Sequence, residues 1–155
     1  GREVALRAGA FGMNVVYHQR TVLSAAATQR WQARYCALDE LLARSDVVFV
    51  TLPENAITRG LLGAEQLARM KPGAMLINVS RAAIVDRAAL LDALRSGRLG
   101  GLGLDTFYEE PGCAGDPLLA CPNAIVTPRI AAQPRLNALG DLADVMANLA
   151  HALRA

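Results

Sequence analysis

Short apolar runs alternate with stretches of helical periodicity along most of this chain. We expect strands at residues 13–18, 34–36, 46–52, 74–79, 101–107 and 124–128. Between them, apolar residues recur at helical spacing at residues 2–11, 38–43, 64–70 and 86–96, and again from Pro134 onward in one long amphipathic helix. Strands that alternate with helices predict a parallel α/β sheet, because each parallel connection has to cross back over the sheet.

Composition limits the classes of protein to which the chain can belong. Its 155 residues are 53% hydrophobic and 19% charged, which suits one globular domain with a buried core. We find no apolar run of the roughly 20 residues that cross a bilayer and no secretory signal pattern, so we expect a cytoplasmic protein without a membrane partner. The net charge is +2 and the arginines are scattered singly, so we expect no nucleic-acid partner.

Few side chains are suited to metal binding. The three cysteines, Cys36, Cys113 and Cys121, are far apart and form no CxxC pair, so we expect incidental thiols and no metal site. The two histidines are His18, at the end of a predicted strand, and His151, on the predicted late helix. We expect structural or surface roles for both.

Three segments place charged side chains near the ends of predicted strands. They are NVSRAAIVD at residues 78–86, GLGLDTFYEEP at 101–111 and TPRIA at 127–131. Arg81 follows one apolar strand and Asp105 falls at the end of another, and open α/β sheets bind ligands beyond the carboxyl ends of their strands. Both residues are therefore candidates for a binding site. A solvated surface arginine and an aspartate that caps a turn are the alternatives.

In this order and at this spacing, the three segments resemble the NAD-binding domain of the D-isomer-specific 2-hydroxyacid dehydrogenases. In that family an arginine, a glutamate and a histidine converge beside the nicotinamide. The resemblance implies that Arg81 binds the substrate carboxylate and polarises the 2-oxo group. It also implies that Glu110 lies at the catalytic centre and that Arg129 stands where the family has its histidine. A guanidinium stays protonated and cannot shuttle a proton, so we expect Arg129 to form an ion pair with Glu110.

The opening GREVALRAGAFGMNVVYHQR resembles the family from the third glycine of its GxGxxG loop onward. Gly1 would then be that glycine, and the first strand would precede it. The resemblance implies a Rossmann-type doubly wound parallel sheet without its first strand, an incomplete NAD(P)-binding domain over residues 1–155, and a substrate domain outside this chain. Since the missing strand would be central, we expect weak hydrogen-exchange protection at residues 13–18 and 46–52, and little activity from the chain alone.

The resemblance also implies the residues that contact a dinucleotide. Gln19 stands where NAD-preferring proteins offer a carboxylate to the ribose, and Arg20 follows with a fork suited to a 2′-phosphate, so we expect NADP in preference to NAD. A solvated surface arginine is the alternative for Arg20. The remaining cofactor contacts implied are Gly1, Leu52, Pro53, Thr58, Val79, Ser80, Arg81 and Asp105.

Three functions remain open. The first is hydride transfer between NAD(P) and a small 2-hydroxy or 2-oxo acid such as glyoxylate or hydroxypyruvate. Here the acid/base group would be Glu110, Tyr108, a water molecule or a histidine from outside this chain. The second is a non-catalytic dinucleotide-binding or regulatory module in which Arg129 binds an anion. The third is a plain structural α/β domain. The resemblance further implies that the protein is a homodimer.

Overall fold

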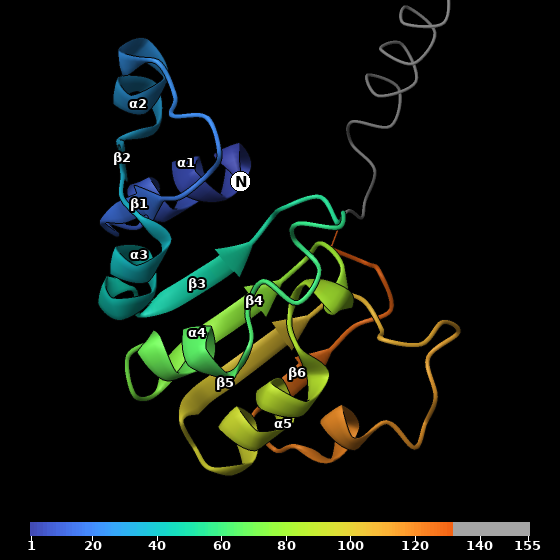
Figure 1. The fold of residues 1–155 in the computed structure, drawn as a ribbon. Coiled ribbons are helices and arrows are strands. Elements are labelled where there is room, and N and C mark those ends of the chain that lie inside the picture. Colours follow the sequence, from blue (N-terminus) through green and yellow to red (C-terminus); the bar gives the residue numbers. More distant parts are fainter. Residues whose placement is uncertain (132–155) are drawn as a thin grey trace, which may run out of the picture.

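The computed structural model describes residues 1–131, which form a parallel α/β fold (Figure 1). The strands are β1 (Val15–Tyr17), β2 (Ala33–Tyr35), β3 (Val47–Val50), β4 (Ala74–Asn78), β5 (Leu99–Leu104) and β6 (Ala124–Val126). The helices are α1 (Arg2–Ala10), α2 (Ala25–Trp31), α3 (Leu38–Arg44), α4 (Ala64–Arg69) and α5 (Arg87–Arg95). Two short 3₁₀ turns, η1 (Ala82–Ile84) and η2 (Pro117–Ala120), precede α5 and β6.

All six predicted strands are present, so the expected parallel α/β class is confirmed. Helix α2 was not predicted, because its sequence AAATQRW has no apolar stripe and none of its residues is buried. It begins at Ser24, whose hydroxyl accepts a hydrogen bond from the amide of Ala27. The predicted helix from Pro134 onward lies outside the described residues.

Parallel pairing joins β3, β4, β5 and β6 in that order, and β1 pairs separately with β2. One face of the four-stranded sheet is buried beneath α4 and α5 (Figure 1), where Leu76 of β4, Leu67 of α4 and Leu90 of α5 belong to one apolar core. Leu76 is fully buried, whereas its neighbour Met75, on the other face, is 45% exposed. This alternation sets the strand register.

The two sheets leave β1 and β3 with facing edges that pair with no strand of residues 1–131. The carbonyl of Asp46 accepts from the amide of Met75, so Asp46 directs its backbone groups toward β4. Because consecutive residues of a strand direct these groups to opposite edges, Val47 and Phe49 direct theirs away from β4. A cavity of about 610 Å³ lies there, lined by residues of α1, β1 and β3. This gap matches the position of the strand expected to be missing.

Within the described part of the chain, no helix has the length and apolar character needed to cross a membrane.

Candidate functional site

The turn after β4 is organised by Asn78, whose side chain is fully buried. Its Nδ2 donates to the carbonyl of Arg81 at 2.9 Å, and its Oδ1 accepts from the amide of Ser80 at 2.9 Å. The hydroxyl of Ser80 in turn donates to the carbonyl of Val50 at the end of β3, at 3.0 Å. The turn is thereby tied to two strands. Sequence analysis did not identify Asn78, although a polar residue at the end of a buried strand was a usable signal.

Arg81 extends from this turn at the carboxyl edge of the sheet. It is exposed, its Nη1 donates to the carbonyl of Ser80 at 2.9 Å, and it forms no ion pair with any residue that the structure describes. Ala82 and Ala83 begin the turn η1 without a left-handed residue. The alanines are therefore compatible with the geometry that presents Arg81.

The loop after β3 lies opposite this turn. A cavity of about 620 Å³ lies between them, lined by Thr51, Leu52, Pro53, Glu54, Ser80 and Arg81. The hydroxyl of Thr58 closes the loop by donating to the carbonyl of Pro53 at 2.7 Å and accepting from the amide of Asn55 at 2.9 Å. The structure therefore brings Leu52, Pro53, Ser80 and Arg81 together and gives Thr58 a role in shaping the loop. Val79, the residue before Ser80, is 40% exposed.

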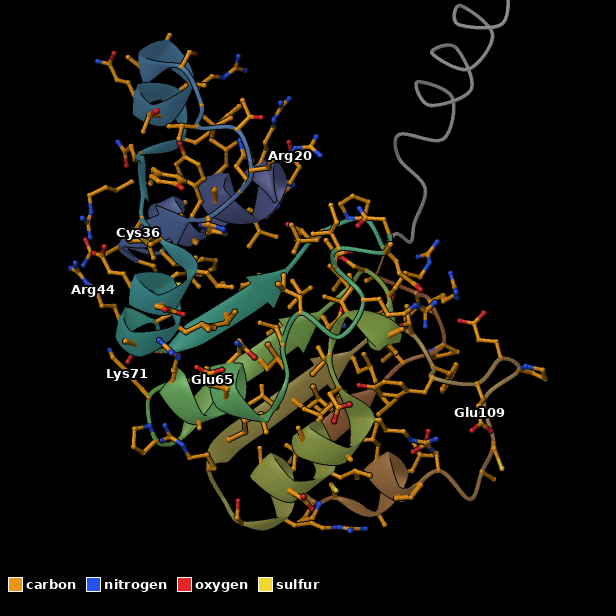
Figure 2. The ribbon with its side chains drawn as sticks, in the orientation of Figure 1. Arg20, Cys36, Arg44, Glu65, Lys71 and Glu109 are labelled. Carbon is orange, nitrogen blue, oxygen red and sulfur yellow. The ribbon has the colours of Figure 1, made fainter. Side chains whose placement is uncertain are left out.

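Glu110 and Arg129 form an ion pair beyond the ends of β5 and β6. Nε and Nη2 of Arg129 lie 2.7 Å and 2.5 Å from Oε1 of Glu110, and both side chains are a little less than half exposed. The pair borders a cavity of about 580 Å³ that is also lined by residues of the loop after β5, on which Glu109 lies (Figure 2). Nη1 of Arg129 has no hydrogen-bond partner within residues 1–131. The guanidinium therefore retains a free donor group.

Tyr108, one of the side chains considered as an acid or base, is anchored to the main chain. Its hydroxyl donates to the carbonyl of Val85 at 2.9 Å, and the guanidinium of Arg87 lies over its ring, 5.5 Å from the centroid. Burial, followed by the nearby charge of Asp86, raises the pKa of the Tyr108 phenol well above its usual range. Its hydroxyl proton is held by a backbone carbonyl, so the structure does not support an acid/base role.

Asp105 lies at the end of β5 and is only 8% exposed. Burial alone raises the pKa of its carboxyl group, but hydrogen bonds from Thr127, Ala131 and Ile130, with the charge of Arg129, bring the net pKa below its usual value. The carboxylate is therefore ionised and bound to the segment after β6. The neighbouring hydroxyl of Thr106 is buried and has no hydrogen-bond partner among the described residues.

The residues expected to bind the adenosine half of a dinucleotide lie around β1. A Cβ atom added to Gly1 would lie 3.0 Å from Oγ1 of Thr51, so a larger residue would crowd this contact. Nε2 of the Gln19 side chain donates to the carbonyl of Thr21 at 2.5 Å. Arg20, in the loop beyond β1 near α1 (Figure 2), is exposed and forms no ion pair within residues 1–131. The structure therefore leaves Arg20 available to an anionic ligand.

His18 contacts other residues of the fold, and the three cysteines are free thiols. Nδ1 of His18 lies 3.1 Å from the carbonyl oxygen of Cys36, and its ring stacks on Tyr35. Cys36 and Cys121 are buried free thiols, and Cys113 is an exposed one. No cluster of three potential metal ligands occurs among residues 1–131.

Comparison with known proteins identifies the family to which this arrangement belongs. Residues 1–131 match the family model of the D-isomer specific 2-hydroxyacid dehydrogenase, NAD binding domain. The glyoxylate/hydroxypyruvate reductase B of Pectobacterium carotovorum is 49% identical over 131 residues, which are 84% of this chain and 41% of that protein. That of Salmonella newport is 42% identical over 144 residues, covering 93% of this chain and 44% of the relative.

Two solved structures show the same fold. A glyoxylate reductase from Paecilomyes thermophila superposes with a TM-score of 0.79 at 44% identity, covering 86% of this chain and 40% of the other. A D-isomer specific 2-hydroxyacid dehydrogenase from Xanthobacter autotrophicus Py2, in complex with NADPH and MES, gives a TM-score of 0.76 at 40% identity, covering 84% of this chain and 41% of the other. The chain thus spans about two fifths of the length of the relatives it matches. It belongs to the D-isomer-specific 2-hydroxyacid dehydrogenase family and has the Rossmann-type fold of that family's NAD-binding domain.

Proposed function

We propose that the whole protein containing this chain is an oxidoreductase that transfers a hydride between NAD(P)H and a small 2-oxo acid, of the glyoxylate or hydroxypyruvate type. The observation that carries the proposal is Arg81. It is an exposed guanidinium without a carboxylate partner in the described part of the chain, at the carboxyl edge of a parallel sheet. Its fork geometry suits a substrate carboxylate. Relatives named as glyoxylate/hydroxypyruvate reductases support this substrate class.

The residues present fit a dinucleotide. The close approach of Gly1 to Thr51 leaves backbone, not side chain, at the start of α1, as close contact with a pyrophosphate requires. Leu52, Pro53 and Ser80 would border the nicotinamide half. When bound, the dinucleotide supplies the hydride. The NADPH complex of the Xanthobacter relative supports a nicotinamide dinucleotide, NAD or NADP, as the cofactor.

We further propose that NADP is preferred over NAD, with Arg20 as the residue that binds the 2′-phosphate. Gln19 contributes no carboxylate that would repel this phosphate, and Arg20 has no competing acidic partner within residues 1–131. Replacing Arg20 by serine should weaken NADPH binding about tenfold and leave NADH binding unchanged, since a charge-assisted hydrogen bond is lost. Arg95, an exposed arginine on α5, provides the matched control.

Proton transfer differs in this proposal from the usual family mechanism. Arg129 cannot release a proton at ordinary pH, Glu110 is engaged in its ion pair, and the Tyr108 hydroxyl is bound to Val85. The alkoxide that forms when hydride reaches the substrate carbonyl carbon would take its proton from water. The free Nη1 of Arg129 would stabilise the negative charge on that oxygen.

The test is the Michaelis constant of the whole protein for a 2-oxo acid. Arg81→Gln should raise this constant about 10- to 100-fold, the value of charge-assisted hydrogen bonds to a carboxylate, while cofactor binding persists. Arg95→Gln, which removes a surface arginine from α5, should leave it unchanged. If the two variants have the same Michaelis constant for the 2-oxo acid, Arg81 does not bind the substrate.

A second candidate function is a non-catalytic dinucleotide-binding module, and the ion pair between Arg129 and Glu110 favours it. In this proposal Arg129 takes the place that the family resemblance gives to the acid/base histidine. For such a module we expect cofactor binding at ordinary affinity and no oxidation of NADPH or NADH by any 2-oxo acid.

A further inference from the structure

The carboxylate of Asp105 gathers the segment that follows β6. Oδ1 accepts hydrogen bonds from the hydroxyl of Thr127 at 2.5 Å and from the amide of Ile130 at 2.8 Å. Oδ2 accepts from the amide of Ala131 at 2.9 Å. Three donors from a stretch of five residues thus converge on one ionised, nearly buried side chain. The carboxylate bridges the end of β5 to this stretch.

Arg129 lies between these anchors in an unfavourable backbone conformation. Its φ is +56°, in the left-handed region that residues with a Cβ rarely adopt. Its own amide donates to the carbonyl of Thr127, and the next two amides donate to Asp105. The hydrogen bonds on either side of Arg129 therefore hold the residue in a conformation that it would not adopt freely.

We propose that Asp105 is a positioning residue that fixes the left-handed turn at Arg129 and thereby directs the guanidinium to Glu110 at the substrate site. The family resemblance places Asp105 beside the nicotinamide. Its three hydrogen bonds to residues 127–131 give it a role within the chain in addition to any such cofactor contact. Only the identity of the substrate in this proposal rests on the proposed function. The hydrogen bonds, and the effect of their loss on the loop, are independent of it.

Thr127→Val tests the proposal with little change of shape, because it removes only the hydroxyl that donates to Asp105. Thr106→Val is the matched control: the same substitution at a buried neighbour of Asp105, whose hydroxyl has no partner within the described residues. Thr127→Ser keeps the hydroxyl and should restore the wild-type behaviour. The three variants are made in the whole protein and compared by hydrogen exchange over residues 127–131, by the dissociation constant for NADPH, and by the Michaelis constant for glyoxylate.

Thr127→Val removes one of the three bonds that hold the segment at residues 127–131 to the Asp105 carboxylate. The segment should then open more often, so exchange of the Ile130 and Ala131 amides, which donate to the same carboxylate, should accelerate about 10- to 100-fold. The variant should also raise the Michaelis constant for glyoxylate and leave NADPH binding unchanged. Unchanged exchange in this variant, or the same acceleration in Thr106→Val, would overturn the proposal. Weaker NADPH binding with unchanged exchange over residues 127–131 would also overturn it, because Asp105 would then act on the cofactor and not on the turn at Arg129. If the wild-type protein reduces no 2-oxo acid, the proposed function fails, and the exchange comparison still decides the role of Asp105.

Discussion

Replacing Arg129 by histidine in the whole protein should raise its turnover of 2-oxo acids. The structure favours this exchange, because Arg129 has a φ of +56° and histidine is among the residues enriched in that region. The new imidazole would lie near Glu110, whose Oε1 is 2.7 Å from Nε of the present arginine. A neighbouring carboxylate raises the pKa of an imidazole, so the ring would be protonated near neutral pH and able to donate its proton.

The expected gain follows from what a positioned general acid contributes, about 10²- to 10⁴-fold. At about 1.36 kcal/mol per factor of ten, this equals about 3 to 5 kcal/mol of lower activation free energy. The strain of the left-handed turn does not add to the cost, since histidine tolerates that conformation at least as well as arginine. The fold should therefore keep its stability while turnover rises.

The assay is steady-state oxidation of NADPH with glyoxylate across a range of pH. Activity of Arg129→His should fall as pH rises through the imidazole pKa, whereas the wild-type guanidinium does not titrate in that range. Arg129→Asn is the matched control, because asparagine also tolerates the left-handed turn but carries no transferable proton. A turnover in Arg129→His no higher than in Arg129→Asn would refute the reasoning that proton transfer limits the wild-type protein.

The other predictions concern the fold and its dependence on acid. In hydrogen exchange of this chain, the amides of Val47 and Phe49, on the open edge of β3, should exchange faster than those of Val48 and Val50, which face β4. Equal protection of all four amides would contradict an open edge at β3. Leu76→Ala should lower the free energy of unfolding by about 2 to 5 kcal/mol, against less than about 1 kcal/mol for Met75→Ala on the exposed face, as measured by denaturant titration. The folded pKa of Asp105 lies below its ordinary value of 3.8. Its contribution to stability is therefore present above pH 3.8 and is lost as pH falls through the folded pKa. Asp105→Asn should reduce this loss of stability at acid pH, as measured by melting temperatures in a pH series.

Much of the fold could be predicted because the hydrophobic pattern is strong where the sheet is buried. β4 and β5 were predicted from apolar runs, and both strands are present, although β5 begins and ends earlier than the run at 101–107 predicted. The helix expected at residues 86–96 is also present as α5, and its start is fixed by Asp86, whose carboxylate accepts from the amide of Ala89 at 2.8 Å. Helix α2 was missed because its sequence AAATQRW has no apolar stripe.

The site could be predicted only in part. The three segments predicted which strand ends carry Arg81, Asp105, Glu110 and Arg129, because the carboxyl ends of parallel strands meet at one edge. Sequence reasoning could not predict hydrogen bonds between segments far apart in the chain. The bond from Thr127 to Asp105 joins residues 22 positions apart, and that from Ser80 to Val50 joins residues 30 apart. The shapes of the turn after β4 and of the segment at residues 127–131 depend on such contacts.

The central claim, hydride transfer to a 2-oxo acid at a site with arginine in place of histidine, is tested most directly by one assay. The whole protein is mixed with NADPH or NADH in parallel and a panel of 2-oxo acids that includes glyoxylate and hydroxypyruvate, and cofactor oxidation is followed. We predict measurable oxidation that depends on the 2-oxo acid and is faster with NADPH. Cofactor binding without oxidation by any acid of the panel would contradict the proposed function and favour a dinucleotide-binding module.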